Sequence, residues 1–437
     1  MIIRLIETSH PRFEAVLKEI LGRRDREEGK VEAPVREIIR AVRRSGDRAL
    51  CRYTRAFDRV RLTPGEIEVK PREMDQAVKL LPGADLGALR LAARRIARFH
   101  RRQVERSWRF RDPLGMVLGQ NITPLERVGV YVPGGKACYP STVLMNVIPA
   151  RVAGVREVVM ATPLGQNAVP ILAAARIAGV DRVFRVGGAQ AIAALAYGTK
   201  TVPRVDKVVG PGNIYVATAK RLLFGQIGID SVAGPSEVLL LADTSADPEY
   251  VAADMLSQAE HDELASALCV TPSRAVARKV QAALEDKLRE TRRRAITLKA
   301  LKRFGAIIVT RNLEEGVRLV NAIAPEHVEI MVRNPERWAR LIKNAGAMFL
   351  GPYATPPLGD YMAGPNHVLP TGGSARFFSP LGTYDFVKRT SFIQCGLRAL
   401  KALAPSIIRV AEMEGLGEHA RAVKCRLNKE KFHGKKG

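Results

Sequence analysis

The pattern of hydrophobic and polar positions changes near Arg127. In residues 11–111, apolar and charged residues recur at three- and four-residue spacing and β-branched runs are few, so this part is predicted to be mostly helical. The segment from Leu86 to Phe110 has the clearest pattern. It is predicted to form a helix whose exposed face is almost wholly cationic.

From Arg127 onward, short apolar runs end in glycine and are followed by alanine-rich segments. This alternation predicts strands, tight turns and helices of a parallel α/β sheet. A second series of alternating strands and helices follows, and it begins with a helix predicted over Pro248 to Ala267. Its strands are predicted around residues 268–272, 305–310, 325–332 and 345–350. The chain is therefore predicted to contain two α/β units.

The stretch from Gly351 to Thr383 is rich in Pro, Gly and Asn and has no period. An irregular stretch of this length in a compact protein is usually a functional loop. Leu397 to Leu427 is predicted to be helical, and the lysines at 429, 431, 435 and 436 are interpreted as a solvated basic tail.

The composition is that of a folded protein with more than one domain. The chain has 437 residues, of which 46% are hydrophobic, and its 36 Gly and 26 Pro are near ordinary usage, which excludes a disordered or collagen-like chain. Lys and Arg number 70 against 44 Asp and Glu, giving a net charge of +26. Such a balance favours anionic partners or substrates.

The arginine-rich helix has two interpretations. Runs of charge usually form a solvated face. The alternative is a nucleic-acid surface, but only Phe99, Trp108 and Phe110 interleave as aromatic residues, and no nucleic-acid motif accompanies them.

The five cysteines lie far apart, with no CxxC pair. Their spacing and odd number argue against a disulfide scaffold or a thiolate zinc finger and favour a reducing compartment. The first sixteen residues lack the pattern of a signal peptide, and no apolar run approaches the ~20 residues of a membrane span. A cytoplasmic location without a membrane partner is expected.

Two glycine-rich junctions are candidates for ligand binding. Gly187–Ala191 and Gly210–Asn213 follow predicted strands, where a doubly wound sheet presents backbone N–H groups to an anion. No P-loop motif is present, and the second junction breaks the dinucleotide pattern GxGxxG at its sixth position. A nucleotide site and glycines that serve only tight turns are both compatible with this pattern.

The seven histidines include candidates for metal binding. Gln258 and His261 are three residues apart on a predicted helix, so they are expected to share a face and could hold one ion. Asp360 in the irregular loop and His419 on the last helix could supply further ligands. Such N and O donors suit zinc, and the lack of thiolates favours a catalytic site. Ordinary surface or core histidines are the alternative.

A second candidate is the pair Glu326-His327, which follows a proline and precedes a predicted strand. An adjacent carboxylate and imidazole suit proton transfer near neutral pH. The alternative is a surface pair at a strand edge. His367 lies inside the irregular loop, a position that favours function over packing.

Eight blocks in order along nearly the whole chain resemble the histidinol dehydrogenase family. They are Arg127-Val-Gly-Val-Tyr-Val-Pro-Gly-Gly, Gly187-Gly-Ala-Gln-Ala, Val209-Gly-Pro-Gly-Asn, Ala233-Gly-Pro-Ser-Glu-Val, Ser257-Gln-Ala-Glu-His-Asp, Ala324-Pro-Glu-His, Gly359-Asp-Tyr-Met-Ala-Gly-Pro-Asn-His-Val-Leu-Pro-Thr and Glu414-Gly-Leu-Gly-Glu-His-Ala. Together they are far more specific than any single motif.

The resemblance implies oxidation of L-histidinol through L-histidinal to L-histidine, the last steps of histidine biosynthesis, with two NAD and one Zn²⁺ per subunit. It implies His327 as the base that removes the hydroxyl proton and Glu326 as the group that activates water. The implied zinc ligands are Gln258, His261, Asp360 and His419. The implied substrate contacts are Ser236, Gln258, His261, His327, Asp360, His367, Glu414 and His419, and the implied NAD contacts are Tyr131, Gln190 and Asn213.

The resemblance also implies the architecture: two incomplete Rossmann-like domains with small helical N- and C-terminal segments, in an intertwined homodimer. Glu414 and His419 would reach the active site of the partner chain. The expected divisions are an N-terminal segment 1–25, a first domain 26–128 plus 238–381, a second, NAD-associated domain 129–237, and a C-terminal segment 382–437.

Two other functions are alternatives to this oxidation. A paralogue could oxidise another small diol or amino alcohol on the same scaffold, but retention of Glu414 and His419 argues against it, because these positions contact the histidinol end. A basic nucleic-acid-binding protein on a decayed scaffold is disfavoured by the intact metal and acid–base positions. The net charge of +26 has no explanation in the dehydrogenase chemistry.

Overall fold

The computed structural model describes residues 2–22, 25–134, 138–165 and 168–428. The predicted basic tail lies outside the described residues. The chain divides into two compact units. Unit 1 contains the residues up to Val104 together with Leu125–Phe386, and unit 2 contains Glu105–Pro124 together with Val387–Gly437.

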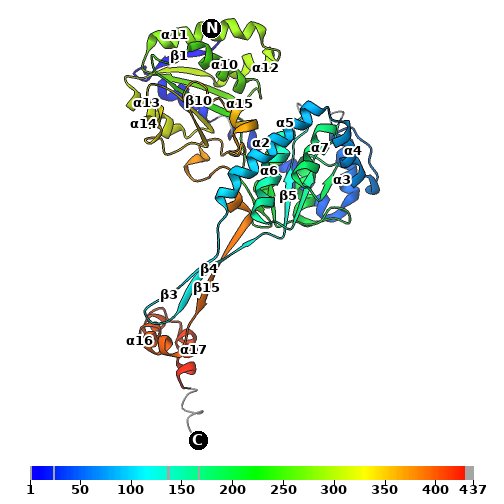
Figure 1. The fold of residues 1–437 in the computed structure, drawn as a ribbon, viewed down its shortest axis with the longest axis vertical. Coiled ribbons are helices and arrows are strands. Elements are labelled where there is room, and N and C mark those ends of the chain that lie inside the picture. The colour runs from blue at the N-terminus through cyan, green and yellow to red at the C-terminus, as the bar shows by residue number, and fades with distance from the viewer. Residues whose placement is uncertain (1, 23–24, 135–137, 166–167, 429–437) are drawn as a thin grey trace. The chain divides into compact units, whose positions relative to one another are not determined.

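Unit 1 contains a first sheet of six parallel strands, which confirms the parallel arrangement predicted from the sequence (Figure 1). In spatial order the strands are β1 (Arg4–Glu7), β12 (Ala306–Val309), β11 (Ser266–Thr271), β10 (Glu237–Ala242), β13 (His327–Met331) and β14 (Ala347–Leu350).

Both faces of the first sheet are buried, because alternate side chains of each strand point to opposite faces. Val238 and Leu240 join a core under three helices, whereas Leu239 and Leu241 join the core on the other face. The first face is covered by α10 (Pro248–Ala259), α11 (Arg274–Glu290) and α12 (Arg294–Phe304). The second face is covered by α1 (Phe13–Leu21), α13 (Leu313–Ile323) and α14 (Pro335–Ala339).

Unit 1 contains a second six-stranded sheet, parallel except for its edge strand β2. In spatial order the strands are β2 (Glu68–Val69), β7 (Arg182–Phe184), β6 (Glu157–Ala161), β5 (Arg127–Tyr131), β8 (Lys207–Val209) and β9 (Gly228–Ile229). Successive strands add to one side of β5 and then to the other, so the order of the sheet reverses between β5 and β8.

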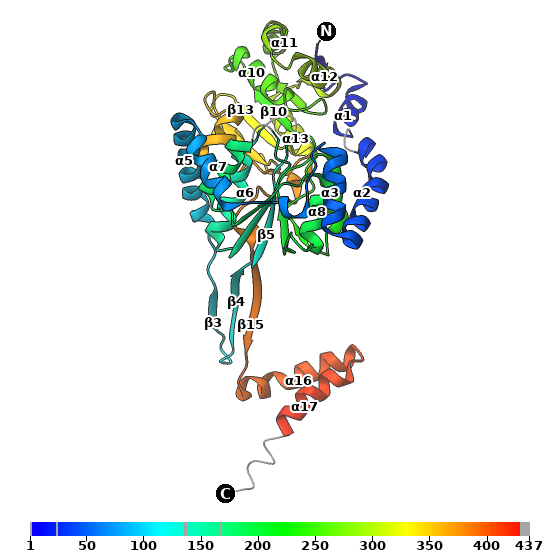
Figure 2. The same cartoon turned by 90° about the vertical axis from the view of Figure 1, so that its right-hand side faces the viewer.

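Eight helices cover the second sheet in two layers (Figure 2). One layer contains α4 (Pro71–Leu80), α5 (Gly83–His100), α6 (Pro140–Ala153) and α7 (Ala168–Ala178). The other contains α2 (Asp25–Ser45), α3 (Asp47–Phe57), α8 (Gly188–Tyr197) and α9 (Ile214–Leu223). Short helical turns complete unit 1: η1 (Pro64–Glu66), η2 (Arg101–Gln103), α15 (Pro356–Leu358), η3 (Gly359–Ala363), η4 (Ser374–Arg376) and η5 (Thr383–Phe386).

Unit 2 combines two distant stretches of the chain in one antiparallel sheet. Strand β4 (Val117–Pro124) pairs with β3 (Trp108–Arg111) on one side and along eight residues with β15 (Val387–Gln394) on the other. Two helices follow, α16 (Leu397–Met413) and α17 (Gly417–Asn428), as predicted for the end of the chain.

Two predicted helices were wrong in extent. The arginine-rich helix ends at His100, and Trp108 and Phe110 lie in β3 instead. The helix predicted over Pro248 to Ala267 ends at Ala259, because the buried strand β11 begins at Ser266. In both places a strand that pairs with distant residues replaces a helix favoured by local spacing.

Elements within residues 26–104 contact the second sheet. Strand β2 pairs with β7, and α2, α4 and α5 pack on helices of that sheet. Glu105–Pro124 belongs to unit 2, and the predicted division into domains stays a prediction. No helix among the described residues is long and apolar enough to cross a membrane.

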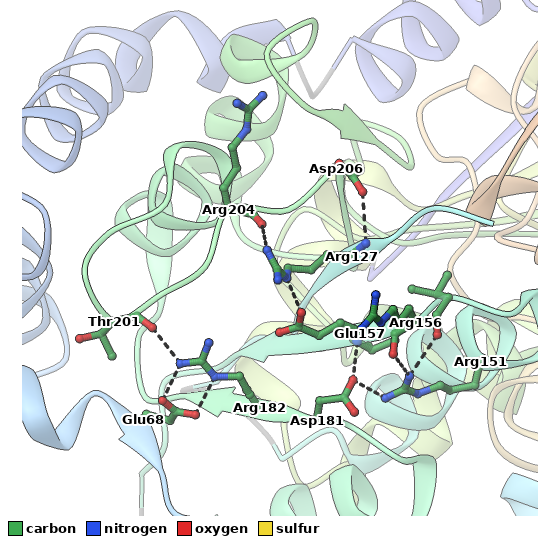
Figure 3. A network of polar contacts seen from close by, with 12 residues as sticks. Glu68, Arg127, Arg151, Arg156, Glu157, Asp181, Arg182, Thr201, Arg204 and Asp206 are labelled. Carbon is green, nitrogen blue, oxygen red and sulfur yellow. Dashed lines mark hydrogen bonds and ion pairs between the residues drawn. The ribbon is translucent and has the colours of Figure 1, made fainter. Parts of the chain in front are cut away.

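Charged side chains link neighbouring strands of the second sheet (Figure 3). Arg182 on β7 donates to both carboxylate oxygens of Glu68 on β2, at 2.8 and 2.7 Å. Arg127 on β5 donates to Glu157 on β6 at 2.6 Å. Each pair links the first residues of neighbouring strands and so helps to fix their register.

The carboxyl end of β8 is held by a buried ion pair. Lys220 on α9 donates to the carbonyl oxygen of Gly210 at 3.0 Å and pairs with Asp230, whose Oδ2 accepts the N–H of Gly210 at 2.8 Å. Their side chains are 2% and 5% exposed. Gly210 has a φ of +111°, and a Cβ there would lie 2.1 Å from the Tyr131 carbonyl oxygen, so only glycine fits.

We expect Lys220→Met to lower the free energy of unfolding by about 3–5 kcal/mol, because it leaves the Asp230 carboxylate buried without its cation. Urea denaturation followed by circular dichroism measures the change. The control is Arg221→Met on the same helix, whose pair with Glu32 is partly exposed and contributes less than about 1 kcal/mol. Equal losses in the two variants would contradict the role of the buried pair.

Candidate active site

Two buried glutamates meet where β10 and β13 begin. The N–H of Glu237 donates to Glu326 Oε2 at 2.8 Å, and the N–H of Glu326 donates to Glu237 Oε2 at 3.3 Å. The strands are neighbours in parallel register, with Val238 opposite His327, so their first residues necessarily lie together. Each carboxylate satisfies a backbone N–H that the ladder leaves unpaired.

His327, the first residue of β13, is buried beside these carboxylates. Its Nδ1 lies 3.0 Å from the carbonyl oxygen of Glu237, and because a carbonyl only accepts, Nδ1 carries the proton. Its Nε2 has no hydrogen-bond partner among the described residues and lies 3.9 Å from Asp360 Oδ1. Nε2 is thus the ring nitrogen available to a ligand.

The charge on His327 is set by competing effects. Burial lowers the pKa of the imidazole, but the Glu326 and Asp360 carboxylates outweigh burial and raise the pKa to about 9. Glu326 Oε2 lies 3.6 Å from Nδ1. The carboxylates therefore favour the protonated ring, and His327 can accept a proton only from its neutral form.

The irregular segment predicted as a functional loop carries Asp360 and His367 to the same place. Asp360 lies in the π-helical turn η3, and its Oδ1 is 4.0 Å from His367 Nδ1. His367 Nδ1 donates to the backbone carbonyl oxygen of Asp360 at 3.1 Å, and its Nε2 is 3.4 Å from the Thr142 hydroxyl. The Asp360 carboxylate thus lies near the imidazoles of His327 and His367.

Buried polar contacts fix this loop. Asn366 donates from its side-chain amide to the Met145 carbonyl oxygen at 2.6 Å and accepts the N–H of Val368 at 2.9 Å. Further along, the N–H of Gly372 donates to Glu237 Oε1 at 3.0 Å, and the Thr371 hydroxyl accepts the N–H of Gly234 at 2.6 Å. Glu237 therefore contacts β13 and the loop together.

Gln258 and His261 were predicted to share a helix face. Gln258 is in the last turn of α10 and is 4% exposed, but the helix ends at Ala259, and His261 is an exposed residue in the bend that follows. The N–H of His261 donates to the Gln258 carbonyl oxygen at 3.2 Å, so a turn still keeps the two residues close. The prediction of a shared helix was wrong.

The predicted zinc ligands are not joined by direct contacts. Neither Gln258 nor His261 makes a side-chain hydrogen bond or ion pair with Asp360 in the described part of the chain. There, no group of three His, Cys, Asp or Glu side chains is arranged to hold a metal ion. Gln258, His261 and Asp360 lie in unit 1, whereas His419 lies in unit 2.

The remaining predicted substrate contacts lie at the ends of elements. Ser236 is half-buried and directly precedes β10. Glu414 ends α16 and His419 lies in the first turn of α17, and both side chains are exposed. Their roles stay predictions.

The three predicted NAD contacts lie at the carboxyl ends of β5, β7 and β8 in the second sheet. The Tyr131 hydroxyl accepts the N–H of Gly188 at 3.0 Å, and burial raises its pKa to about 12. Gln190 in the first turn of α8 is 1% exposed, and both its amide atoms lack a partner among the described residues. Asn213 caps α9 by accepting the N–H groups of Tyr215 and Val216.

A buried glutamate that sequence reasoning missed lies behind His327. Glu329 is two residues along β13 and so shares its face of the sheet, and it is 0% exposed. Burial raises the pKa of Glu329 well above its usual range, and the nearby Asp254 carboxylate adds to the shift. A glutamate inside the apolar run His327–Met331 was the available signal.

Asp254 connects this glutamate to the other site segments. It lies one turn before Gln258 on α10, and its Oδ1 accepts the Thr355 hydroxyl at 2.7 Å. Thr355 directly precedes α15, which runs into the turn that carries Asp360. The segments that carry Gln258, His327 and Asp360 therefore meet in one polar cluster.

The fold and the cluster together define a class. A buried histidine with one free ring nitrogen, flanked by carboxylates at the strand ends of a two-sheet α/β fold, is equipped for acid–base catalysis. The protein is thus an α/β enzyme in its architecture and site chemistry.

Comparison with known proteins indicates which family of α/β enzymes the chain resembles. The family model for histidinol dehydrogenase matches residues 21–427. The chain is 52% identical over 427 residues to the histidinol dehydrogenase of Syntrophotalea carbinolica, covering 97% of this chain and 99% of the relative. It is 53% identical over 401 residues to that of Aquifex aeolicus, covering 92% and 93%.

A solved crystal structure supports the same family. The crystal structure of histidinol dehydrogenase from Elizabethkingia anophelis superimposes with a TM-score of 0.90 at 32% sequence identity, covering 98% of this chain and 99% of that one. The chain therefore belongs to the histidinol dehydrogenase family, oxidoreductases of histidine biosynthesis. The resemblance inferred from the eight sequence blocks is confirmed.

We expect the free energy of unfolding of the Glu329→Gln variant to rise relative to that of the natural protein as pH increases. In the unfolded chain Glu329 ionises above about pH 4.3, whereas in the folded protein it keeps its proton. The folded state then binds more protons, so its stability falls with rising pH by up to about 1.4 kcal/mol per pH unit, until the folded pKa is reached. The variant lacks this titration.

Urea denaturation at about each pH unit between pH 5 and pH 8 measures the free energy of unfolding and tests this expectation. The exposed Glu336→Gln is the matched control, and its difference from the natural protein should not change with pH in this way. If the free energies of unfolding of both variants change with pH in the same way as that of the natural protein, Glu329 is ionised in the folded state and the interpretation is wrong.

Proposed function

We propose that the protein oxidises L-histidinol through L-histidinal to L-histidine, with two NAD as hydride acceptors and one Zn²⁺ per subunit, in the cytoplasm. Family membership supports the substrate. The observation that carries the proposal is His327, whose Nε2 is free while Nδ1 is fixed on the Glu237 carbonyl. We further propose that the active unit is a homodimer.

The first oxidation removes a hydroxyl proton and a hydride from the alcohol carbon. From its neutral form, His327 Nε2 would take the hydroxyl proton, and a bound NAD would supply the acceptor for the hydride that leaves the alcohol carbon. The carboxylates of Glu326 and Asp360 stabilise the imidazolium that forms, since both lie within 4 Å of the ring nitrogens.

The second oxidation adds water to the aldehyde. Glu326 would accept one proton from the attacking water, and protonated His327 would return one to the carbonyl oxygen, giving the hydrated aldehyde. A second hydride would then pass to another NAD and a proton to His327, leaving the carboxylic acid, which ionises. Glu326 Oε2 is held by the N–H of Glu237 at 2.8 Å, so the carboxylate keeps its position during both steps. Adjacent residues at one strand start thus serve the two successive proton transfers.

Gln258, His261, Asp360 and the partner subunit's His419 would hold the zinc. Their N and O donors suit Zn²⁺, and three ligands from one chain leave room for a fourth from elsewhere. When bound, the ion would act as a Lewis acid that orients the substrate. Asp360 is fixed for this role through its neighbour His367 and through the turn anchored by Thr355.

Tyr131, Gln190 and Asn213 would contact NAD. They lie on both sides of the point between β5 and β8 where strand order reverses, the usual ligand position in a doubly wound sheet. The unpaired buried amide of Gln190 supports this assignment, because such a group needs a partner from a ligand or water. Ser236, His367 and the partner subunit's Glu414 would contact histidinol.

We expect two NADH for each histidinol consumed, measured by absorbance. His327→Asn should lower kcat by about 10²–10⁴-fold because the proton acceptor is lost, and chelation should abolish turnover until Zn²⁺ is restored. The exposed His10→Asn is the control and should keep full activity. Absence of NAD reduction with histidinol would refute the function, and one NADH per histidinol would refute the second oxidation.

We expect subunits with different defects to complement each other. His327→Asn and His419→Ala should each be inactive alone. If His419 serves the partner's site, refolding an equal mixture gives heterodimers in which one of two sites is intact, and about a quarter of the natural activity returns. No recovery, with dimers present by gel filtration, would place His419 in its own subunit's site or outside it.

A further inference from the structure

A surface groove of about 880 Å³ is lined by residues of helices α5, α6 and α7 on the second sheet. Figures 1 and 2 show where these helices lie. Its floor is aliphatic, and most of these side chains pack against the core of the second sheet. The floor residues are Ala93, Ala97, Ile148, Val152, Ile177 and Ala178. None of the residues that line the groove is aromatic.

One side of the groove is a row of arginines on α5 and on the turn η2 that follows it. Arg90, Arg94 and Arg98 lie on α5 at four-residue spacing and so along one face of the helix, and Arg101, three residues further on, begins η2. All four side chains are exposed, and none makes a hydrogen bond or ion pair with the described residues. Their charge is therefore uncompensated within this part of the chain.

The acidic groups near the groove are already engaged. On the far side Arg151 pairs with Asp181 and donates to the Gly179 carbonyl oxygen at 2.9 Å, and Asp75 pairs with Arg176 at 2.7 Å. Like charges four residues apart destabilise a helix by about 0.2–0.5 kcal/mol per pair. The row thus reduces the stability of α5 unless an anion from outside neutralises it.

We propose that this groove binds an acidic amphipathic α-helix of another protein. Carboxylates at four-residue spacing on such a helix repeat every ~6 Å, the same interval as the arginines, while its apolar ridge covers the aliphatic floor. Single-stranded nucleic acid fits less well, because the lining offers no ring on which a base could stack. None of these residues belongs to the candidate active site, so the proposal is independent of the catalytic function.

The test uses the full-length protein and fluorescein-labelled probes in an anisotropy titration. The first probe is a peptide of about 18 residues, five helical turns, with a leucine ridge flanked by glutamates. The second has the same composition in scrambled order, and the third replaces the leucines by serine. The fourth is an oligouridylate of similar length.

Two protein variants lose the same charge at different places. The groove variant is Arg90→Gln/Arg94→Gln/Arg98→Gln/Arg101→Gln. The control is Arg40→Gln/Arg44→Gln/Arg48→Gln/Arg55→Gln, four exposed arginines on α2 and α3. Circular dichroism and histidinol oxidation should be unchanged in both, which shows that they fold.

We expect the amphipathic peptide to bind about tenfold or more tightly than the scrambled and serine peptides. The groove variant should lose about tenfold in affinity for it, and the control less than about twofold. Equal binding of all peptides, equal losses in both variants, or no binding at all would overturn the proposal. Preferential binding of the oligouridylate that depends on the groove arginines would instead identify a nucleic-acid surface.

Discussion

The reciprocal hydrogen bonds between Glu237 and Glu326 are the constraint on which the candidate active site depends. The two carboxylates are buried, and each accepts the other residue's backbone N–H. Because unpaired buried carboxylates are costly, this exchange fixes where β10 and β13 begin relative to each other. The ring of His327 takes its orientation from the Glu237 carbonyl, and Gly372 attaches the loop to the same glutamate.

The two sheets use opposite ends of their strands. In the second sheet, Tyr131 and the glycine turn at Gly210 lie at carboxyl ends, where ligands of doubly wound folds usually bind. In the first sheet the polar cluster lies at the amino ends, where Glu237 and His327 begin their strands. Fold class alone would therefore direct attention to the carboxyl edge of the first sheet, whereas its buried polar cluster lies at the amino edge.

Much of this arrangement could be predicted from the sequence, because apolar runs such as Glu237–Ala242 fit only buried strands and the family blocks give the site residues their order. Glu326, His327, Asp360 and His367 lie close together, and the roles of these residues and of Gln258, His261 and His419 stay predictions.

The failures have physical causes. Local spacing could not reveal that Trp108–Arg111 pairs with β4, because this pairing depends on a distant partner. Nor could it show that Glu329 keeps its proton, which results from complete burial beside Asp254. Pairing partners and burial depth are properties of the assembled fold, and a single sequence encodes them only indirectly.

The pairing of β4 with β15 has a consequence for biosynthesis. Strand β4 ends at Pro124, and its partner does not begin until Val387. At about 5–20 residues per second, the ribosome needs roughly 13–50 s to produce the intervening ~260 residues. During that time the hairpin of β3 and β4 presents an open edge, and a two-stranded ribbon is only marginally stable in water. Nascent chains thus have an interval in which this edge can pair with another polypeptide or with a chaperone.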